Sequence, residues 1–133
     1  KELSMNVAGV RAAIEERINA FNQVEESAWS DSDKATYTML NLYKKYLDVV
    51  ENKQAVAHAR EAMNENYALS NEDGIEGKTA REKMVEVRAA LVSAKTDYMK
   101  ALSIFNEVVR DTNHSLRTRQ SINTISLTLV SML

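Results

Sequence analysis

The sequence contains no cysteine and no proline, and only three of its 133 residues are glycine. Without cysteine there can be no disulfide scaffold, no thiolate metal site and no cysteine nucleophile. A β-sandwich or barrel needs many turns rich in glycine and proline, so the scarcity of both argues against those folds. The remaining composition favours helix formers such as alanine, glutamate, lysine and leucine. We therefore expect an all-α protein.

Charge is nearly balanced, with 17 basic and 19 acidic side chains. Nucleic-acid binders usually carry a basic excess, so we predict no nucleic-acid partner. Phosphate-binding glycine loops and nucleophile elbows are absent from the sequence, and so is the Glu-x-x-His pattern of metal-binding bundles. We expect the two histidines, His58 and His114, at solvated positions. The sequence thus predicts a protein that is not an enzyme and binds no cofactor, metal or identified small molecule.

Apolar or small side chains recur every seven residues along both halves of the chain. One row runs from Val7 through Leu42 to Met63, and another from Ala80 through Ala101 to Leu129. Rows with this spacing define helix faces that are buried against other helices. Between the halves, residues 69–77 hold two of the three glycines, so we predict the main turn there.

Two weaker breaks, at 30–33 and 111–115, are rich in residues that cap helices. With both breaks, the chain forms an antiparallel, up-down bundle of four helices at about 3–29, 34–68, 78–110 and 115–131, a single domain over 1–133. Without them, two long helices form a coiled-coil-like hairpin. We favour four helices because short helices are commoner than very long ones. The two-helix form buries only one stripe and would need a partner or a dimer.

Five residues are candidates for an interface or a hinge: Trp29, Tyr43, Tyr46, Arg117 and Arg119. Trp29 lies beside the first break and is expected to anchor that junction, with a partner interface as the alternative. Tyr43 and Tyr46 are about one helical turn apart and are expected at the edge of the core. Arg117 and Arg119 precede a segment without charge, 120–133, which we interpret as a buried terminal helix or the beginning of a membrane span.

Two functional hypotheses follow from these features. The first is a structural or interaction domain that contacts a protein partner, or itself, through helix faces, in a bacterial secreted, surface or secretion-system assembly. The alternative is the extracytoplasmic ligand-sensing four-helix bundle of a transmembrane receptor, with membrane proximity at the C-terminal end. Both hypotheses favour an extracytoplasmic or secreted location. Because the chain begins at Lys1, we expect it to be a processed product or a piece of a longer protein.

Overall fold

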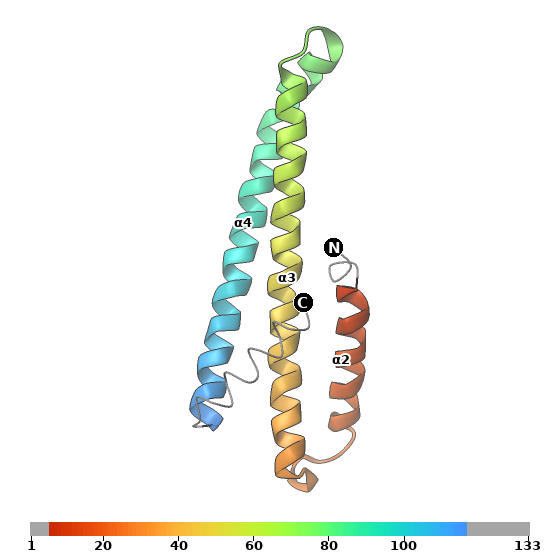
Figure 1. The fold of residues 1–133 in the computed structure, drawn as a ribbon, viewed down its shortest axis with the longest axis vertical. Coiled ribbons are helices and arrows are strands. Elements are labelled where there is room, and N and C mark those ends of the chain that lie inside the picture. The colour runs from red at the N-terminus through yellow and green to blue at the C-terminus, as the bar shows by residue number, and fades with distance from the viewer. Residues whose placement is uncertain (1–5, 117–133) are drawn as a thin grey trace. The chain divides into compact units, whose positions relative to one another are not determined.

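The computed structural model describes residues 6–116, and all regular structure among them is helical (Figure 1). Helix α2 spans Val7–Asn22, the short 3-10 helix η1 spans Glu26–Ala28, α3 spans Asp31–Ser70 and α4 spans Gly74–Leu116. No strand occurs in this part of the chain. The prediction of an all-α fold is confirmed for these residues.

The chain divides into two compact units, and the two long helices contribute to both. Among the described residues, unit 1 contains 6–50 and 102–116, so it holds α2, the first part of α3 and the last part of α4. Unit 2 contains residues 51–101, which are the second part of α3, the turn and the first part of α4.

Unit 1 has a core of large apolar side chains from three helical segments. Helix α2 lies antiparallel beside the first part of α3 (Figure 1), and the last part of α4 packs against the same core through Phe105 and Val108. Leu42 and Leu47 on α3 are each only 1% exposed. The other buried members are Val7, Ile14, Ile18, Leu40 and Tyr43. The sevenfold row therefore faces inward at Val7, Ile14 and Leu42, as predicted.

The predicted first helix, 3–29, is too long, because the link between α2 and α3 interrupts it. Helix α2 ends at Asn22, and Glu25 and Trp29 adopt extended backbone conformations on either side of η1. Helix α3 then begins with a reciprocal cap, in which Ser30 Oγ accepts from the Asp33 amide and Asp33 Oδ2 accepts from the Ser30 amide, both at 3.0 Å. A break between the first two long helices is confirmed, but it lies at 23–30 rather than at 30–33, and the second helix spans Asp31–Ser70 rather than 34–68. The continuous first helix of the two-helix alternative is wrong. Ala28 and Ala35, which continue the sevenfold row across this break, are both exposed.

Unit 2 is a helical hairpin with a tight turn. Its seam contains Val56 and Met63 from α3, and Ala80 and Leu91 from α4, as the sevenfold rows predicted. Only residues 71–73 separate the two helices, so the predicted turn, 69–77, is too long. Gly74 begins α4 with φ of +86°, a conformation that favours glycine. A Cβ on Gly77 would lie 1.8 Å from the Glu72 carbonyl oxygen, so only glycine allows this close turn.

The second predicted break, at 111–115, is wrong for the described residues, because α4 continues through Leu116. Thr112 is 7% exposed and continues the inward-facing row of Phe105, so packing outweighs the capping preference of these residues. The third helix therefore does not end at 110. Residues 117–131 of the predicted fourth helix lie outside the described residues. Four helices and an up-down topology are not confirmed, and the single domain stays a prediction.

Candidate interaction surfaces

An aromatic cluster closes the link between α2 and α3. The ring centroids of Phe21 and Trp29 are 5.5 Å apart, those of Trp29 and Tyr37 are 4.7 Å apart, and those of Phe21 and Tyr37 are 5.9 Å apart. The Trp29 indole N–H donates a hydrogen bond to the Val24 carbonyl at 3.2 Å. Trp29 thus lies at the junction where the sequence analysis expected an anchor. Its use as an interface with another protein stays a prediction.

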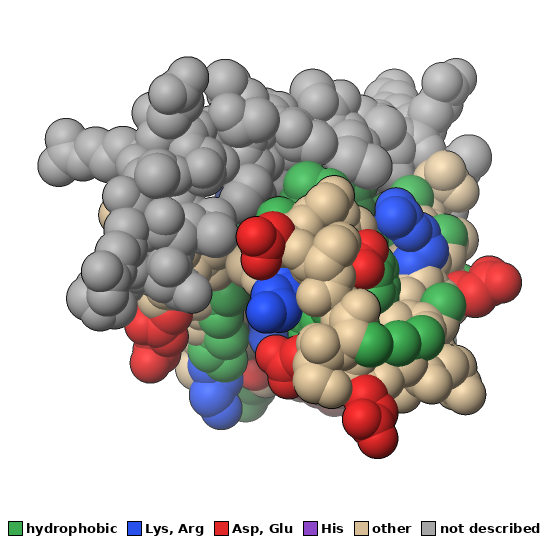
Figure 2. Space-filling model, turned by 90° about the horizontal axis from the view of Figure 1, so that it is seen from below, with side chains coloured by type: hydrophobic (Ala, Val, Ile, Leu, Met, Phe, Trp, Pro, Cys, Tyr) green, Lys and Arg blue, Asp and Glu red, His purple; other side chains and the backbone are tan. Residues whose placement is uncertain are grey.

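Beside this cluster lies a hollow of about 390 Å³. Most of the residues that line it are apolar, and Arg17 and Asp33 add one charge of each sign. The other lining residues are Ala20, Phe21, Val24, Ala28 and Trp29. Figure 2 looks onto this end of unit 1 and shows hydrophobic side chains exposed between acidic and basic ones. The hollow is open to solvent, whereas small-molecule sites usually enclose most of their ligand.

The two candidate tyrosines are packing residues within unit 1. Tyr43 is only 4% exposed, and the Tyr46 ring lies 5.3 Å from that of Phe105. Burial raises the pKa of both hydroxyls, and the nearby Tyr46 raises the pKa of Tyr43 further. Both hydroxyls are therefore neutral at physiological pH. The other two candidates, Arg117 and Arg119, lie outside the described residues.

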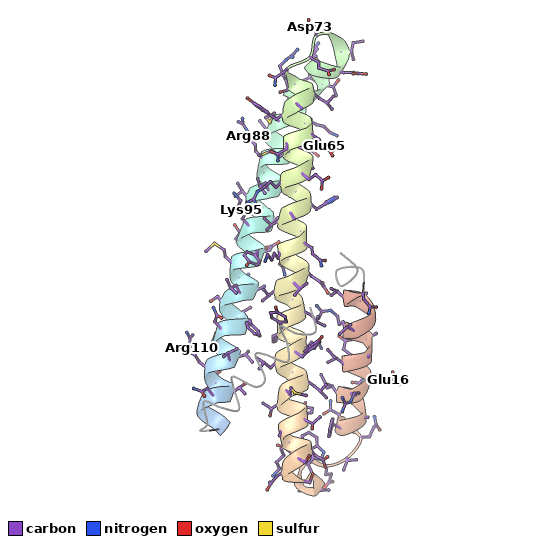
Figure 3. The ribbon with its side chains drawn as sticks, viewed as in Figure 1. Glu16, Glu65, Asp73, Arg88, Lys95 and Arg110 are labelled. Atoms are coloured by element: carbon purple, nitrogen blue, oxygen red, sulfur yellow. The ribbon has the colours of Figure 1, made fainter. Side chains whose placement is uncertain are left out.

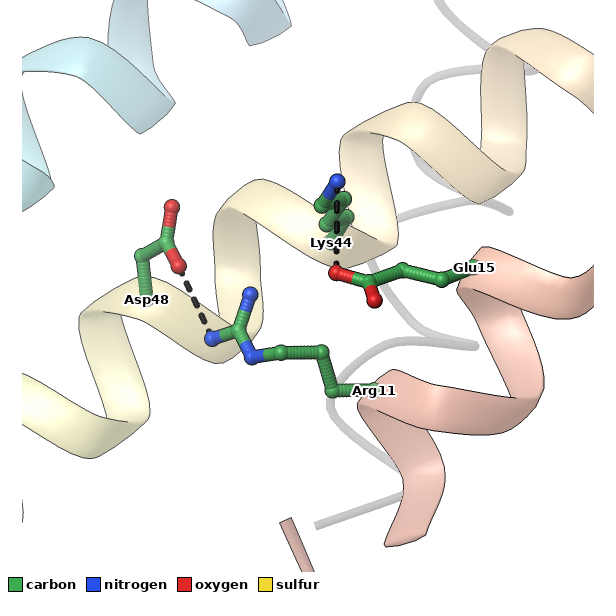
Figure 4. Close-up of polar contacts among 4 residues, drawn as sticks. All are labelled: Arg11, Glu15, Lys44 and Asp48. Carbon is green, nitrogen blue, oxygen red and sulfur yellow. Dashed lines mark ion pairs between the residues drawn. The ribbon is translucent and has the colours of Figure 1, made fainter. Parts of the chain in front are cut away.

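Two ion pairs connect α2 with α3 (Figure 4). Arg11 Nη2 lies 2.8 Å from Asp48 Oδ1, and Lys44 Nζ lies 3.4 Å from Glu15 Oε1. The members of the pairs are four residues apart on each helix, so the pairs follow each other by about one turn. All four side chains are partly exposed, which limits the strength of each pair. Their effect is to favour one register of α2 on α3.

The turn end of unit 2 is fixed mainly by polar groups. The Asn66 side-chain amide donates to the Ala80 carbonyl at 2.8 Å, and Arg81 Nη1 donates to the Ser70 carbonyl at 2.8 Å. A second open hollow, of about 450 Å³, lies beside these contacts, and Ile75 on its wall is 83% exposed. The Arg81 bond satisfies a backbone carbonyl at the end of α3, and both bonds hold the start of α4 close to α3.

A row of exposed apolar side chains on α4 consists of Val85, Val92 and Met99, and is named here the outer α4 row. These side chains are 78%, 63% and 69% exposed. Their spacing of seven residues places them on one side of the helix. Arg88 and Lys95 follow Val85 and Val92 by three residues, so a basic flank runs beside the row (Figure 3).

The outer α4 row was not predicted from the sequence. Its signal is the same sevenfold spacing that identified the seam. Two rows on α4, one through Ala80 and Val87 and one through Met84 and Leu91, already accounted for a buried face. The sequence alone does not tell whether a third row is buried or exposed. That depends on the finding that no described helix covers that side of α4.

Neither a metal centre nor a membrane-spanning helix is found in residues 6–116. No three His, Asp or Glu side chains there come together in a way that could hold a metal ion. None of the described helices has an apolar stretch of the length needed to cross a bilayer.

No family model, curated protein or solved structure matches this chain.

Proposed function

We propose that this chain is a helical interaction domain without enzymatic activity, and that it contacts another protein through the outer α4 row. The observation that carries the proposal is the exposure of Val85, Val92 and Met99, each more than three-fifths open to solvent in one line along the helix. Single exposed apolar residues are normal on a protein surface. A row at coiled-coil spacing is different, because a second helix can cover all of it at once.

The energetics support this use of the row. Burying one large aliphatic side chain contributes roughly 1.5–3 kcal/mol, so three of them supply several kcal/mol toward the cost of association. The charged flank formed by Arg88 and Lys95 would select among helices that could pack there. The ligand-sensing alternative has less support, because the two hollows described above are open rather than enclosed between helices.

The proposal can be tested by placing a photoreactive amino acid at Val92 of the full chain, in cells that produce it. We expect a covalent adduct to a polypeptide after irradiation, whose identity mass spectrometry then provides. The matched control places the same amino acid at Lys45, an exposed position on α3 in unit 1. Absence of any adduct from Val92, or equal yields from the two positions, would contradict the proposal.

A further inference from the structure

We propose that the outer α4 row packs against α3 of a second copy of this chain. This inference rests on the proposed function and names its partner. The receiving surface consists of Ala55, Ala62 and Leu69, named here the α3 row, all of which are exposed. Leu69 is 43% exposed despite its size. Both rows belong to unit 2, so one hairpin presents both halves of the contact.

The two rows match in length and in spacing. Each has three members at intervals of seven residues, which corresponds to two turns of a coiled coil between successive layers. With the helices antiparallel, Val85 meets Leu69, Val92 meets Ala62 and Met99 meets Ala55. The longest flexible side chain, that of Met99, then lies opposite an alanine. A large residue that faces a small one allows the two helices to approach closely.

Charge favours this partner over a second α4. Arg88 and Lys95 flank the outer α4 row, and Glu65 flanks the α3 row, three residues after Ala62. Figure 3 labels Arg88 and Lys95 on α4 and Glu65 on α3. Arg88, Lys95 and Glu65 all have exposed side chains, and none forms an ion pair within the described part of the chain.

The antiparallel arrangement also aligns Arg88 with Glu65. Because the charged flank follows the apolar row by three residues in both helices, antiparallel packing brings the two flanks to the same side of the contact. In the register given above, Arg88 of one copy is level with Glu65 of the other. Two α4 rows packed antiparallel would instead bring basic flank against basic flank, which is unfavourable.

Such a contact joins different surfaces of the two copies. In a pair of copies joined this way, one copy still has a free α3 row and the other still has a free outer α4 row. Further copies can bind to these rows, so association continues into a ring or an open chain. The antiparallel order of α3 and α4 within the hairpin means that successive hairpins point in the same direction. The expected product is therefore a graded series of oligomers rather than a dimer alone.

The test is sedimentation equilibrium on the purified full chain at concentrations up to about 1 mM, where contacts with a millimolar Kd become populated. We expect the average mass to rise with concentration above the 15.0 kDa of one chain. Arg88→Glu and Glu65→Arg should each weaken association about tenfold, because attraction becomes repulsion. An equimolar mixture of these two variants should associate again, since each supplies the charge that the other lacks.

Controls separate the contact from folding and from general charge. Lys45→Glu and Glu107→Arg make the same charge changes at exposed positions of unit 1 and should leave association unchanged. Circular dichroism confirms that each variant remains helical. A chain that stays monomeric throughout, or variants at 88 and 65 that associate like the wild type, would overturn the inference. If the chain is monomeric but the photoreactive amino acid at Val92 captures a different protein, the second copy is wrong and the proposed function stands; if neither occurs, both are wrong.

Discussion

Units 1 and 2 share the same two long helices, yet they bury very different sets of side chains. The buried residues of unit 1 include Leu42, Leu47 and Tyr43, together with Val7, Ile14, Ile18, Leu40 and Val49. In unit 2 the buried apolar residues are only Ala80 and Leu91. The cause is the third helical segment: α2 covers a second side of α3 in unit 1. Two helices alone can bury only the stripe along which they touch.

The two units also differ in the apolar side chains that they leave exposed to solvent. The large apolar side chains of unit 2 that remain open to solvent are Tyr67, Leu69, Ile75, Val85, Val92 and Met99, whereas among the described residues of unit 1 they are Val24 and Ile104. Unit 1 is thus a covered core, and unit 2 is a hairpin with apolar surface left over. A partner would therefore gain most by binding to unit 2.

The sharpest test of this difference compares one leucine from each unit. Leu42→Ala in unit 1 should lower the free energy of unfolding by about 3–4 kcal/mol, because a side chain that is 1% exposed leaves a cavity among three helical segments. Leu91→Ala in unit 2, at 6% exposed, should cost about 2 kcal/mol, since a two-helix seam can relax around the gap. Urea denaturation followed by circular dichroism measures both. Equal losses would contradict the view that the two units are packed differently.

The stability of the turn in unit 2 should depend on whether the backbone leaves room for a side chain, rather than on the burial of apolar side chains. Gly77→Ala should cost about 2–4 kcal/mol, because the added Cβ would lie 1.8 Å from the Glu72 carbonyl oxygen and the backbone must move. Gly74→Ala adds no close contact and should cost only about 1–2 kcal/mol for its positive φ. Thermal and urea unfolding of both variants provide the comparison. A Gly74 variant that is less stable than the Gly77 variant would show that the close approach at Gly77 is unimportant.

Much of this fold could be predicted from the sequence. The seam of unit 2, the turn near Gly74 and the break before Asp31 follow from sevenfold spacing, glycine and capping residues. These signals are local, because each depends on residues within about one or two helical turns. The predicted helix boundaries are less accurate. The first helix is predicted to end at 29, whereas α2 ends at Asn22.

The remaining features depend on contacts between segments that are distant in sequence. Ala28 and Ala35 keep the sevenfold spacing but are exposed. The link between α2 and α3 changes the direction of the chain, so the inward-facing pattern begins anew on α3. Residues 111–113 resemble a cap, yet Thr112 packs inward and the helix continues. The candidate site was mostly missed for the same reason. Whether Val85 is a surface residue or a core residue depends on which side of α4 is covered.

Asn66 tests whether a polar contact fixes the seam of unit 2. Its side chain is 8% exposed and its amide donates to the Ala80 carbonyl, a bond that joins α3 to α4. Asn66→Ala should lower stability by about 1–2 kcal/mol, because the bond is lost within a buried seam. Asn64→Ala, at an exposed position of the same helix, is the control and should be nearly neutral. Hydrogen exchange at residues 63–84 would show whether the seam loosens there, and protection equal to the wild type would contradict a role for this amide.

The smallest effect is expected at the ion pair that connects α2 with α3 in unit 1. If the core described above holds α2 in place, then Arg11→Met and Asp48→Asn should each cost only about 0.2–1 kcal/mol, since side chains that are 21% and 41% exposed interact weakly across solvent. A double-mutant cycle isolates the pairwise energy from the other contacts of the two residues. Repeating it at about 1 M salt, where the Debye length is about 3 Å, should weaken the coupling. A coupling energy well above 1 kcal/mol that persists in high salt would mean that unit 1 differs from unit 2 by its charges as much as by its apolar core.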